Sequence, residues 1–472
     1  MAEDRINVSE QVSMILDIAN LLRGPFTEAE YEKVIIPMTI CRRFECILEK
    51  TKPAVIEAFK SGVKNEIKLK YKSGLPIYNT SELTLKKLLD DSNKIKENFK
   101  AYLNAFNPLG RSIFENLEFF KTVDKLSEKK KLYTVIKKFA YTDLTIDHVS
   151  SIKMGYIMEE IIRKYSENAS AGDHFTPREV IRCLTQLLLA EGCDDLKEPG
   201  KIVTLGDFAC GTGGMLYEGY DKIKELNPSA EVALFGQDNS DKYTAIALAE
   251  TIIRGQNPEN IKLVDSTLVT DAHEEQKMRL ILMNPPFGES WSKDKVGEEQ
   301  YKKILKHNTD ANGWYKAGLP QSSDMQMLFW QFAINKLQDN GRAAIICNAS
   351  PLFIGGAKSG ESNIRKWLFE HDYVEAIIEF CPELFYNTGI SIYAFIFNKN
   401  KSERRKGKIQ LINAQDFCKR LNKGLGFKRN ELTSEHINKI VELYTAFEEN
   451  KNCKIFDKED FYYKNVRCSL QG

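Results

Sequence analysis

A short apolar run that ends in two consecutive prolines constrains this sequence more than any other feature. Residues 280–282 (Leu-Ile-Leu) have the length and composition of a buried strand, and Asn284, Pro285, Pro286 and Phe287 follow closely. Proline fixes φ and has no N–H to donate, so the backbone has to turn sharply at this point. Ligands of open α/β sheets bind outside the carboxyl edge of the strands, which makes this turn a candidate binding position.

The turn carries groups that suit a planar exocyclic amine. The side-chain oxygen of Asn284 and the carbonyl of Pro285 are two acceptors on a stiff backbone, and Phe287 supplies an aromatic face beside them. The acceptors would take the amine hydrogens, draw electron density onto the nitrogen and aim its lone pair, while the ring stacks on the base. For these residues taken alone, an ordinary strand-ending turn is the alternative.

Composition narrows the class of protein. A chain of 472 residues, 42% of them hydrophobic, suggests two to four domains with substantial cores, and no run of 18 apolar residues is present to span a membrane. The charged N-terminus shows no secretory signal. The ten cysteines form no C-x-x-C pair, so we expect reduced, mostly buried thiols in a cytosolic protein. With a net charge of +1, any DNA affinity has to come from local patches or from a partner.

The pattern of apolar residues divides the chain into three predicted parts. Residues 1–165 carry helical stripes and form an all-helical N-terminal domain. Residues 166–400 begin with a polar linker and then alternate strands with helices, which predicts a doubly wound α/β sheet. Residues 401–472 are expected to be a short, partly helical tail. Seven strands are predicted, at 202–205, 232–235, 261–264, 279–283, 343–347, 374–378 and 392–397, and the polar stretch 289–320 is predicted to be a long loop.

A glycine-rich loop follows the first predicted strand. Its glycines permit a tight turn and close approach of a ligand to backbone N–H groups. The spacing matches neither the dinucleotide fingerprint nor a P-loop, and Asp207 before the glycines would repel a phosphate. S-adenosylmethionine, with its sulfonium and amino acid tail, therefore fits better than ATP or NAD. The candidate contacts here are Asp207, Ala209, Gly211, Thr212, Gly213 and Gly214.

Polar residues also end the next strands in chain order. Asp238 could accept both hydroxyls of a ribose, and Asp265 could accept a hydrogen bond from the adenine amine of the same ligand. For a single aspartate, a helix cap or a solvated turn is the alternative. The full series of Asp207, Asp238, Asp265 and Asn284 places four polar residues at successive strand ends on one sheet edge, which chance does not readily give.

A further candidate contact lies upstream of the glycine-rich loop. Thr176 can cap a helix, Pro177 suits its first position, and Arg178 follows. Capping is one interpretation; the other is that the Thr176 hydroxyl and the N–H groups of this helix hold the carboxylate of the ligand. Phe175 belongs to the same stretch, and His174 is either a ligand contact or a loop residue.

Taken together, these motifs resemble the amino-methyltransferases that form N6-methyladenine in DNA, in their gamma arrangement. More narrowly, the chain resembles the modification subunit of type I restriction-modification systems, and the likeness covers nearly its whole length. The family often has Pro where Phe208 stands and Glu where Asp238 stands, and its C-terminal tail is usually longer. The motifs are Leu21-Leu22-Arg23-Gly24 with Tyr31 and Ile35-Ile36-Pro37, Phe175-Thr176-Pro177, Asp207-x-Ala209-Cys210-Gly211-Thr212-Gly213-Gly214, Gly236-Gln237-Asp238, Asn284-Pro285-Pro286-Phe287-Gly288 and Phe385-Tyr386-Asn387-Thr388-Gly389-Ile390.

The resemblance implies a seven-stranded, Rossmann-like methyltransferase sheet and an S-adenosylmethionine-dependent, site-specific DNA methyltransferase that acts on N6 of a flipped adenine. It also implies adenine stacking on Phe287 and Phe385, and no metal. Only about 70 residues follow the last predicted strand, too few for a DNA-reading module. The implied partners are double-stranded DNA, a separate specificity subunit that bridges two copies of this chain, and a restriction subunit, all in the cytoplasm and away from membranes.

Two other functions remain open at this point. The first is methylation of another planar nitrogen, such as an rRNA guanine or a protein glutamine. The second is a non-catalytic scaffold with the same fold. Phe287 and the long helical N-terminal domain favour DNA adenine over the first alternative, and the intact glycine-rich loop with the intact 284–287 turn argues against the second.

Overall fold

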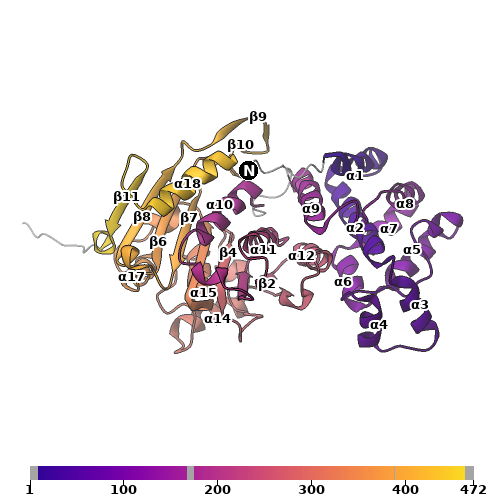
Figure 1. The fold of residues 1–472 in the computed structure, drawn as a ribbon, viewed down its shortest axis with the longest axis horizontal. Helices are drawn as coiled ribbons and strands as arrows, with labels where there is room; N and C mark the ends of the chain where they lie inside the picture. The colour runs from indigo at the N-terminus through magenta and orange to yellow at the C-terminus, as the bar shows by residue number, and fades with distance from the viewer. Residues whose placement is uncertain (1–8, 167–174, 387, 463–472) are drawn as a thin grey trace, which may run out of the picture. The chain divides into compact units, whose positions relative to one another are not determined.

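The computed structural model describes residues 9–166, 175–386 and 388–462, and the chain forms two compact units (Figure 1). One unit is helical and consists of Met1–Ala169 together with Ser240–Ile261. The other contains the central sheet and consists of Ser170–Asn239 together with Lys262–Gly472.

Amphipathic helices make up the helical unit. An apolar stripe of residues 31–41 is buried on α2, which begins directly after Thr27. The Glu30 carboxylate accepts a hydrogen bond from the Thr27 backbone N–H at 3.0 Å, and this capping contact holds the start of the helix. The helices of the N-terminal part of this unit are α1 (Ser9–Leu22), α2 (Glu28–Leu48), α3 (Lys52–Lys60), α4 (Glu66–Ser73), α5 (Ile95–Asn104), α6 (Pro108–Asn116), α7 (Phe119–Glu128), α8 (Leu132–Ala140) and α9 (Ser151–Ser166).

Helix α12 (Asp241–Ile253) belongs to the helical unit although it lies between two strands of the sheet in sequence. It packs on α2 and α6, and the Ser151 hydroxyl donates a hydrogen bond to the Ile253 carbonyl at 2.9 Å. Almost all of its second half is buried. The chain therefore leaves the sheet unit after residue 239 and returns to it at residue 262.

Nine strands form the central sheet in the described part of the second unit, in the order β11-β8-β6-β7-β5-β4-β1-β2-β3. Strand β1 pairs in parallel with β2 and β4, β4 pairs in parallel with β5, and β7 runs antiparallel between β5 and β6. The strands are β1 (Ile202–Asp207), β2 (Glu231–Asp238), β3 (Ile261–Leu263), β4 (Met278–Met283), β5 (Leu337–Cys347), β6 (Val374–Phe380), β7 (Tyr393–Asn398), β8 (Lys408–Ala414) and β11 (Cys453–Asp457).

The predicted α/β class is confirmed, and each of the seven predicted strands corresponds to one of β1–β7. The strand count differs, because β8 and β11 extend the sheet beyond β6. Polar Lys408 and Gln410 interrupt the apolar pattern of β8, which hid this strand in the sequence. Residues 289–320, predicted to be a loop, instead contain the short helix α13 (Lys293–Val296) and α14 (Glu298–Thr309).

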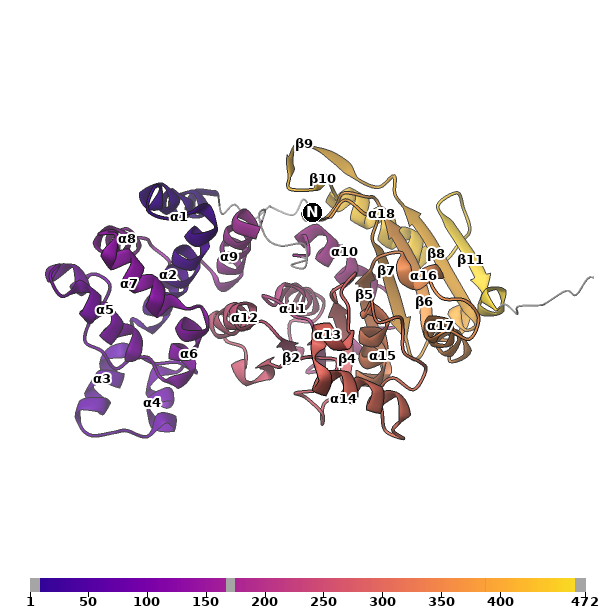
Figure 2. The same ribbon diagram turned by 180° about the vertical axis from the view of Figure 1, so that it is seen from behind.

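Helices cover both faces of the sheet, so its central strands are buried on both sides. Helix α11 (Gly214–Leu226) packs so closely on one face that a Cβ at Gly219 would lie 2.6 Å from Leu205 and 3.1 Å from Leu282. Helices α10 (Arg178–Leu189) and α18 (Ser434–Ala446) lie with it (Figure 1). Helices α15 (Gln326–Lys336) and α17 (Gly360–Glu370) cover the opposite face (Figure 2).

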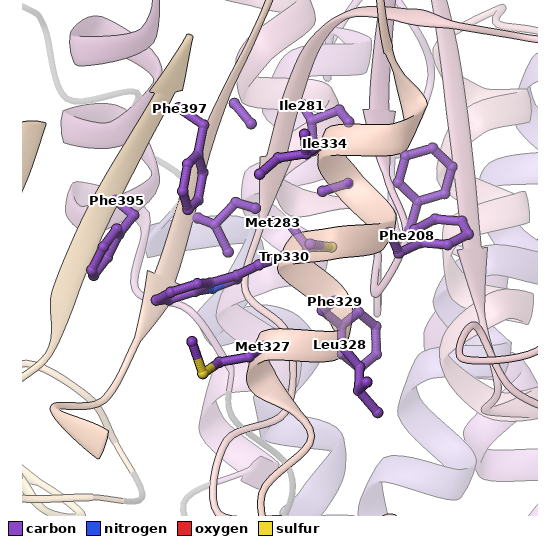
Figure 3. Close-up of a cluster of buried hydrophobic side chains, with 14 of the residues drawn as sticks. Phe208, Ile281, Met283, Met327, Leu328, Phe329, Trp330, Ile334, Phe395 and Phe397 are labelled. Carbon is purple, nitrogen blue, oxygen red and sulfur yellow. The ribbon is translucent and has the colours of Figure 1, made fainter. Parts of the chain in front are cut away.

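A cluster of aromatic and aliphatic side chains fills the space between α15 and the sheet (Figure 3). Trp330 of α15 is fully buried, with ring centroids 4.4 Å from Phe395 and 5.5 Å from Phe397 on β7. Ile281 and Met283 of β4 belong to the same cluster. Because successive strand residues point to opposite faces, Leu282 packs under α11 while its two neighbours pack under α15.

In the described residues no helix combines the length and apolar character that a membrane span requires. The described residues also include nine cysteines, all of them free thiols and eight of them buried.

A buried polar cluster ties α18 to the middle of the sheet. The Arg342 guanidinium on β5 donates to the Glu375 carboxylate on β6 at 3.0 Å and to the Tyr444 hydroxyl on α18 at 2.6 Å. Tyr444 also donates to Glu375. Burial opposes the charge on Glu375, but Arg342 and Arg405 outweigh it and keep the pKa of this carboxyl below its ordinary value.

Removing the charge of Glu375 should therefore destabilise the sheet unit. Glu375→Gln leaves the Arg342 guanidinium buried without its carboxylate, at an expected cost of about 3–5 kcal/mol. Urea denaturation followed by circular dichroism measures this loss. The matched control is Glu298→Gln, which removes an exposed ion pair with Lys302 on α14 and should leave the denaturation midpoint unchanged. Equal midpoints for the two variants would contradict the structural role of the cluster.

Candidate functional site

The parallel register of three strands brings the predicted polar residues to one edge of the sheet. Strand β1 lies between β2 and β4, and Asp207 at its end pairs with Gly236 near the end of β2. Asp238 is the last residue of β2, and Asn284 directly follows β4. Asp207, Asp238 and Asn284 therefore meet at the carboxyl edge of neighbouring parallel strands, as predicted.

Hydrogen bonds from backbone N–H groups hold the glycine-rich loop, which follows β1, against the end of β2. The Gly211 N–H donates to the Asp238 carboxylate at 2.9 Å, and the Cys210 N–H donates to the Gln237 carbonyl at 3.1 Å. On the other side, the Asp207 carboxylate accepts from the Ala209 N–H at 3.1 Å. The two aspartates thus hold the loop as well as lining the edge.

Two glycines of the loop adopt backbone conformations that other residues rarely adopt. Gly211 has φ +51° with open space where a Cβ would stand, and Gly213 has φ +88°. A Cβ at Gly213 would lie within 2.7 Å of the Tyr217 ring. Helix α11 begins directly afterwards, at the exposed Gly214, with half-buried Thr212 inside the turn. The loop thus presents backbone rather than side chains at Gly211 and Gly214.

Asp207 is almost completely buried, and burial raises the pKa of its carboxyl to about 8, with a smaller contribution from the nearby Asp238. Burial and the same two carboxyls also raise the pKa of the Cys210 thiol, which makes it a poor nucleophile. A cationic ligand beside Asp207 would favour its ionised form. The electrostatics of this edge therefore favour a positively charged ligand.

The 284–287 turn contacts the Phe175-Thr176-Pro177 stretch across 108 residues of sequence. The Asn284 Nδ2 donates a hydrogen bond to the Thr176 Oγ1 at 2.8 Å. This contact sets the orientation of the amide, because the side-chain oxygen then lies at the end turned away from Thr176. Asn284 and Thr176 are both half-buried, and Pro285 is buried.

The predicted helix after Thr176 is present, with its start displaced by one residue. Pro177 is the capping residue and α10 begins at half-buried Arg178, so Thr176 stands one position before the cap. Its hydroxyl contacts Asn284 instead of capping the helix. The Phe175 ring lies 6.1 Å from the Tyr386 ring, which joins this stretch to the predicted 385–390 motif. His174 lies outside the described residues.

Both rings expected to stack on a base are buried. Phe287 is 5% exposed and Phe385 is 1% exposed. A planar base that stacks on either ring therefore has to enter the protein rather than lie on its surface. Pro286 is half-buried, and Gly288 after Phe287 has φ +74°, which lets the chain turn away from the edge.

Asp265 is more exposed than the other predicted residues at the strand ends. It is exposed and stands two residues after β3. The Val264 N–H donates to the Asp238 backbone carbonyl at 2.9 Å, which keeps this segment beside the end of β2. Asp265 therefore belongs to the same edge, but at its solvent-exposed side.

No role was predicted for Gln237, which is fully buried behind the glycine-rich loop. Its amide donates to the Thr267 hydroxyl and to the Thr270 carbonyl, both at 3.0 Å, and accepts from the Ala272 N–H at 3.0 Å. Thr267 in turn donates to the Phe208 carbonyl at 2.7 Å. The only signal in the sequence was the position of this glutamine between a glycine and an aspartate at a strand end, and that signal does not indicate which residues it contacts.

The described residues hold no group of three or more His, Cys, Asp and Glu side chains that could bind a metal ion. The arrangement instead offers two acidic strand ends, an open glycine turn and an oriented amide with a buried ring. These groups can bind a cation and a planar amine side by side.

The α/β fold of this chain has counterparts among solved structures. The fold matches that of a solved type I restriction-modification methyltransferase subunit from Streptococcus thermophilus, with a TM-score of 0.75, 20% identity and 96% coverage of each chain. A solved modification subunit of a putative type I restriction enzyme from Vibrio vulnificus gives a TM-score of 0.61 at 15% identity, covering 97% of this chain and 94% of the other. These likenesses concern the fold.

The chain belongs to the N-6 DNA methylase family, whose sequence pattern matches residues 150–468. Residues 12–139 match the HsdM N-terminal domain. The predicted family is thereby confirmed, and both parts of the sequence resemblance are accounted for.

Curated relatives of moderate identity are named methylase subunits of type I restriction enzymes. The MjaVII methylase subunit of a type I restriction enzyme from Methanocaldococcus jannaschii is 29% identical over 384 residues, 75% of this chain and 59% of the relative. The MpnII methylase subunit from Mycoplasma pneumoniae is 25% identical over 393 residues, 78% of this chain and 65% of the relative. The chain thus spans less than two thirds of the length of these relatives.

The raised pKa of Asp207 predicts a specific pH dependence of stability. The unfolded carboxyl ionises near pH 4 and the folded one near pH 8, so the folded state binds the extra proton between these values. The contribution of Asp207 to stability is therefore fully present below pH 4 and decreases as pH rises to 8, by at most about 1.4 kcal/mol per pH unit.

Asp207→Asn removes this titration while keeping a side-chain oxygen that can accept from Ala209. Melting temperatures of the wild type and the variant, compared from pH 5 to 9, measure the effect. The melting temperature of the variant should rise relative to that of the wild type as pH increases to about 8. Above pH 8 the difference between the two melting temperatures should stay constant. Parallel curves over the whole range would contradict the assignment.

Proposed function

We propose that this protein is an adenine-specific DNA methyltransferase that uses S-adenosylmethionine and works as the modification subunit of a type I restriction-modification system. The hydrogen bond from Asn284 to Thr176 carries the proposal, since it joins two motifs distant in sequence beside the glycine-rich loop. Family membership supports the same chemistry. No observation favours the rRNA, protein or scaffold alternatives.

The residues at the sheet edge fit the cofactor. Asp207 and Asp238 suit a cation and a pair of ribose hydroxyls, and the open position at Gly211 admits a ligand close to the backbone. Phe175, Thr176, Pro177 and Arg178 line the neighbouring stretch, with Asp265 at the exposed side. S-adenosylmethionine, when bound here, would supply an electrophilic methyl group.

The chain itself binds and orients the target adenine. The base has to leave the duplex to reach buried Phe287, at a cost of a few kcal/mol in lost stacking. Stacking on Phe287 or Phe385 would return about 1–3 kcal/mol. Asn284 and the Pro285 carbonyl would accept the two N6 hydrogens and leave the nitrogen lone pair directed at the methyl donor.

The proposed partners follow from the relatives, which are named methylase subunits of type I restriction enzymes. We propose that this chain acts with a specificity subunit, two copies of the chain to one such subunit, and with a restriction subunit on double-stranded DNA. A complex that modifies cellular DNA would work in the cytoplasm.

Incubating the chain and its co-purifying partners with methyl-labelled S-adenosylmethionine tests the function directly. Duplex DNA, rRNA and protein are offered separately, and the methylated base is identified by mass spectrometry after digestion. Label in N6-methyladenine of DNA supports the proposal. Label only in RNA or protein, or cofactor binding with no transfer to any acceptor, refutes it.

Asn284→Ala should abolish most methyl transfer. One of the two acceptors for the N6 hydrogens is lost, and removal of one preorganised hydrogen-bonding group typically lowers kcat by about 100- to 1000-fold. Single-turnover methylation measures the change. Asn438→Ala, on the exposed side of α18, is the matched control and should methylate at the wild-type rate.

Thr176→Val separates the two roles open to this threonine, because valine keeps the shape and removes the hydroxyl. If the hydroxyl orients Asn284, kcat falls while the affinity for S-adenosylmethionine is unchanged. If it holds the ligand carboxylate, the affinity falls as well. Thr176→Ser should retain activity in both cases.

Asp238 should contribute to cofactor affinity beyond its hold on the loop. Asp238→Asn can still accept from the Gly211 N–H, but it loses the charge and one acceptor oxygen. We expect the Kd for S-adenosylmethionine to rise about tenfold in Asp238→Asn and about 100-fold in Asp238→Ala, measured by calorimetry. Equal affinities in all three proteins would remove Asp238 from the cofactor site.

A further inference from the structure

A separate basic hairpin projects from the sheet unit. Strands β9 (Lys419–Leu425) and β10 (Lys428–Glu431) pair antiparallel with each other and, within the described residues, stay outside the central sheet (Figures 1 and 2). Among its 13 residues, one is acidic, Glu431, and five are basic, Lys419, Arg420, Lys423, Lys428 and Arg429. Five minus one leaves a charge of +4 on the basic hairpin, whereas the whole chain carries +1.

Much of this charge faces solvent. The side chains of Lys419 and Arg420 remain 65% and 62% exposed even though they pair with Glu431 and Glu383. Lys423 is also exposed. Because side chains alternate along a strand, Lys419 and Lys423 share one face of β9. Exposed ion pairs of this kind are weak, so an incoming anion can replace the glutamates.

An exposed aromatic ring accompanies the charges. Phe427, at the turn between β9 and β10, is 60% exposed. The neighbouring Gly426 has φ +59° and lies so close to Tyr386 that an added Cβ would meet its carbonyl oxygen at 2.3 Å. The turn is therefore held in place while the ring of Phe427 is exposed to solvent. The ring does not contribute to the hydrophobic core of the protein.

The basic hairpin is fixed to the segment that carries Phe385. The Phe427 N–H donates to the Tyr386 carbonyl at 2.7 Å, and the Arg429 N–H donates to the Glu383 carbonyl at 2.9 Å. Lys428 is buried, donating to the Leu384 carbonyl at 2.9 Å and pairing with Glu179 at the start of α10. Hydrogen bonds and an ion pair thus join the hairpin to the segment that carries Phe385 and to the start of α10.

We propose that the basic hairpin binds the phosphate backbone of duplex DNA beside the adenine that enters the site, with Phe427 packed against the sugars or bases next to it. This inference rests on the proposed function. Lysine and arginine side chains that neutralise phosphates release counterions, which gives affinity without sequence preference. Base sequence would then be read elsewhere, as expected of a chain with a separate specificity subunit.

A protein partner is the competing occupant of the basic hairpin. An acidic protein surface would also satisfy the charges. The attachment beside Phe385 favours DNA, because a flipped adenine stacked on Phe385 or Phe287 forces the flanking backbone to pass close to this segment.

The test uses the full-length chain, a fluorescein-labelled 30-base-pair duplex and anisotropy titrations from 50 to 200 mM salt. In Lys419→Ala/Lys423→Ala we expect at least tenfold weaker binding at low salt. The slope of log K against log salt should fall by about 2, one for each lysine that contacts a phosphate. Phe427→Ala should weaken binding without changing the slope.

The matched control is Lys366→Ala/Lys406→Ala, which removes two exposed lysines of the same unit that also pair with glutamates. It should bind DNA as the wild type does. All variants should bind S-adenosylmethionine with unchanged affinity in calorimetry, which shows that they are folded.

The outcomes separate this inference from the proposed function. Absence of DNA binding by the wild-type chain, or equal DNA binding by hairpin and control variants, overturns the hairpin inference even if adenine is methylated. Hairpin variants that lose a co-purifying protein but keep DNA affinity assign the surface to that protein and also overturn it. Hairpin-dependent DNA binding without methyl transfer supports it while refuting the proposed function.

Discussion

The parallel pairing of β1 with β2 and β4 is the constraint on which the candidate site depends. Parallel strands end at the same edge, so side chains separated by dozens of residues in sequence arrive together without any loop having to reach across the sheet. Main-chain hydrogen bonds between the strands set this arrangement, and buried apolar side chains such as those of β4 hold the strands in the core. Function at the edge is therefore coupled to packing in the core beneath it.

Asp207 shows how that coupling works. Its carboxyl sits at the end of a buried strand between two other strands, where water cannot stabilise its charge. The fold thus holds an acid in its neutral form near neutral pH. Burial that is unfavourable for the isolated protein becomes useful when a cation arrives, because an ionised carboxylate in a low-dielectric position attracts it strongly.

Much of the sheet could be predicted from sequence, because strands buried on both faces read as continuous apolar runs, as residues 280–282 do. Strand β8 escaped because Lys408 and Gln410 interrupt its pattern, and its place is decided by main-chain pairing with β6. Helix α14 escaped because little of it is buried. A local sequence pattern predicts an element through its buried apolar residues. Helix α14 has few such residues, and in β8 they are interrupted by polar ones.

The candidate site divides in the same way. Asp207, Asp238 and Asn284 could be predicted, since each stands at the end of a recognisable strand or directly after it. The contact between Thr176 and Asn284 could not, because no local pattern links residues 108 positions apart. The same holds for Gln237, whose three hydrogen bonds reach residues 30 to 35 positions away.

The membership of α12 in the helical unit has a consequence for dissecting this protein into fragments. A cut after residue 169 would not release an intact sheet unit, since residues 240–261 would remain and expose the apolar side chains that α2 and α6 normally cover. Such a fragment would be prone to aggregation for reasons unrelated to the candidate site. A usable fragment has to replace the excursion between Asn239 and Lys262 with a short polar linker.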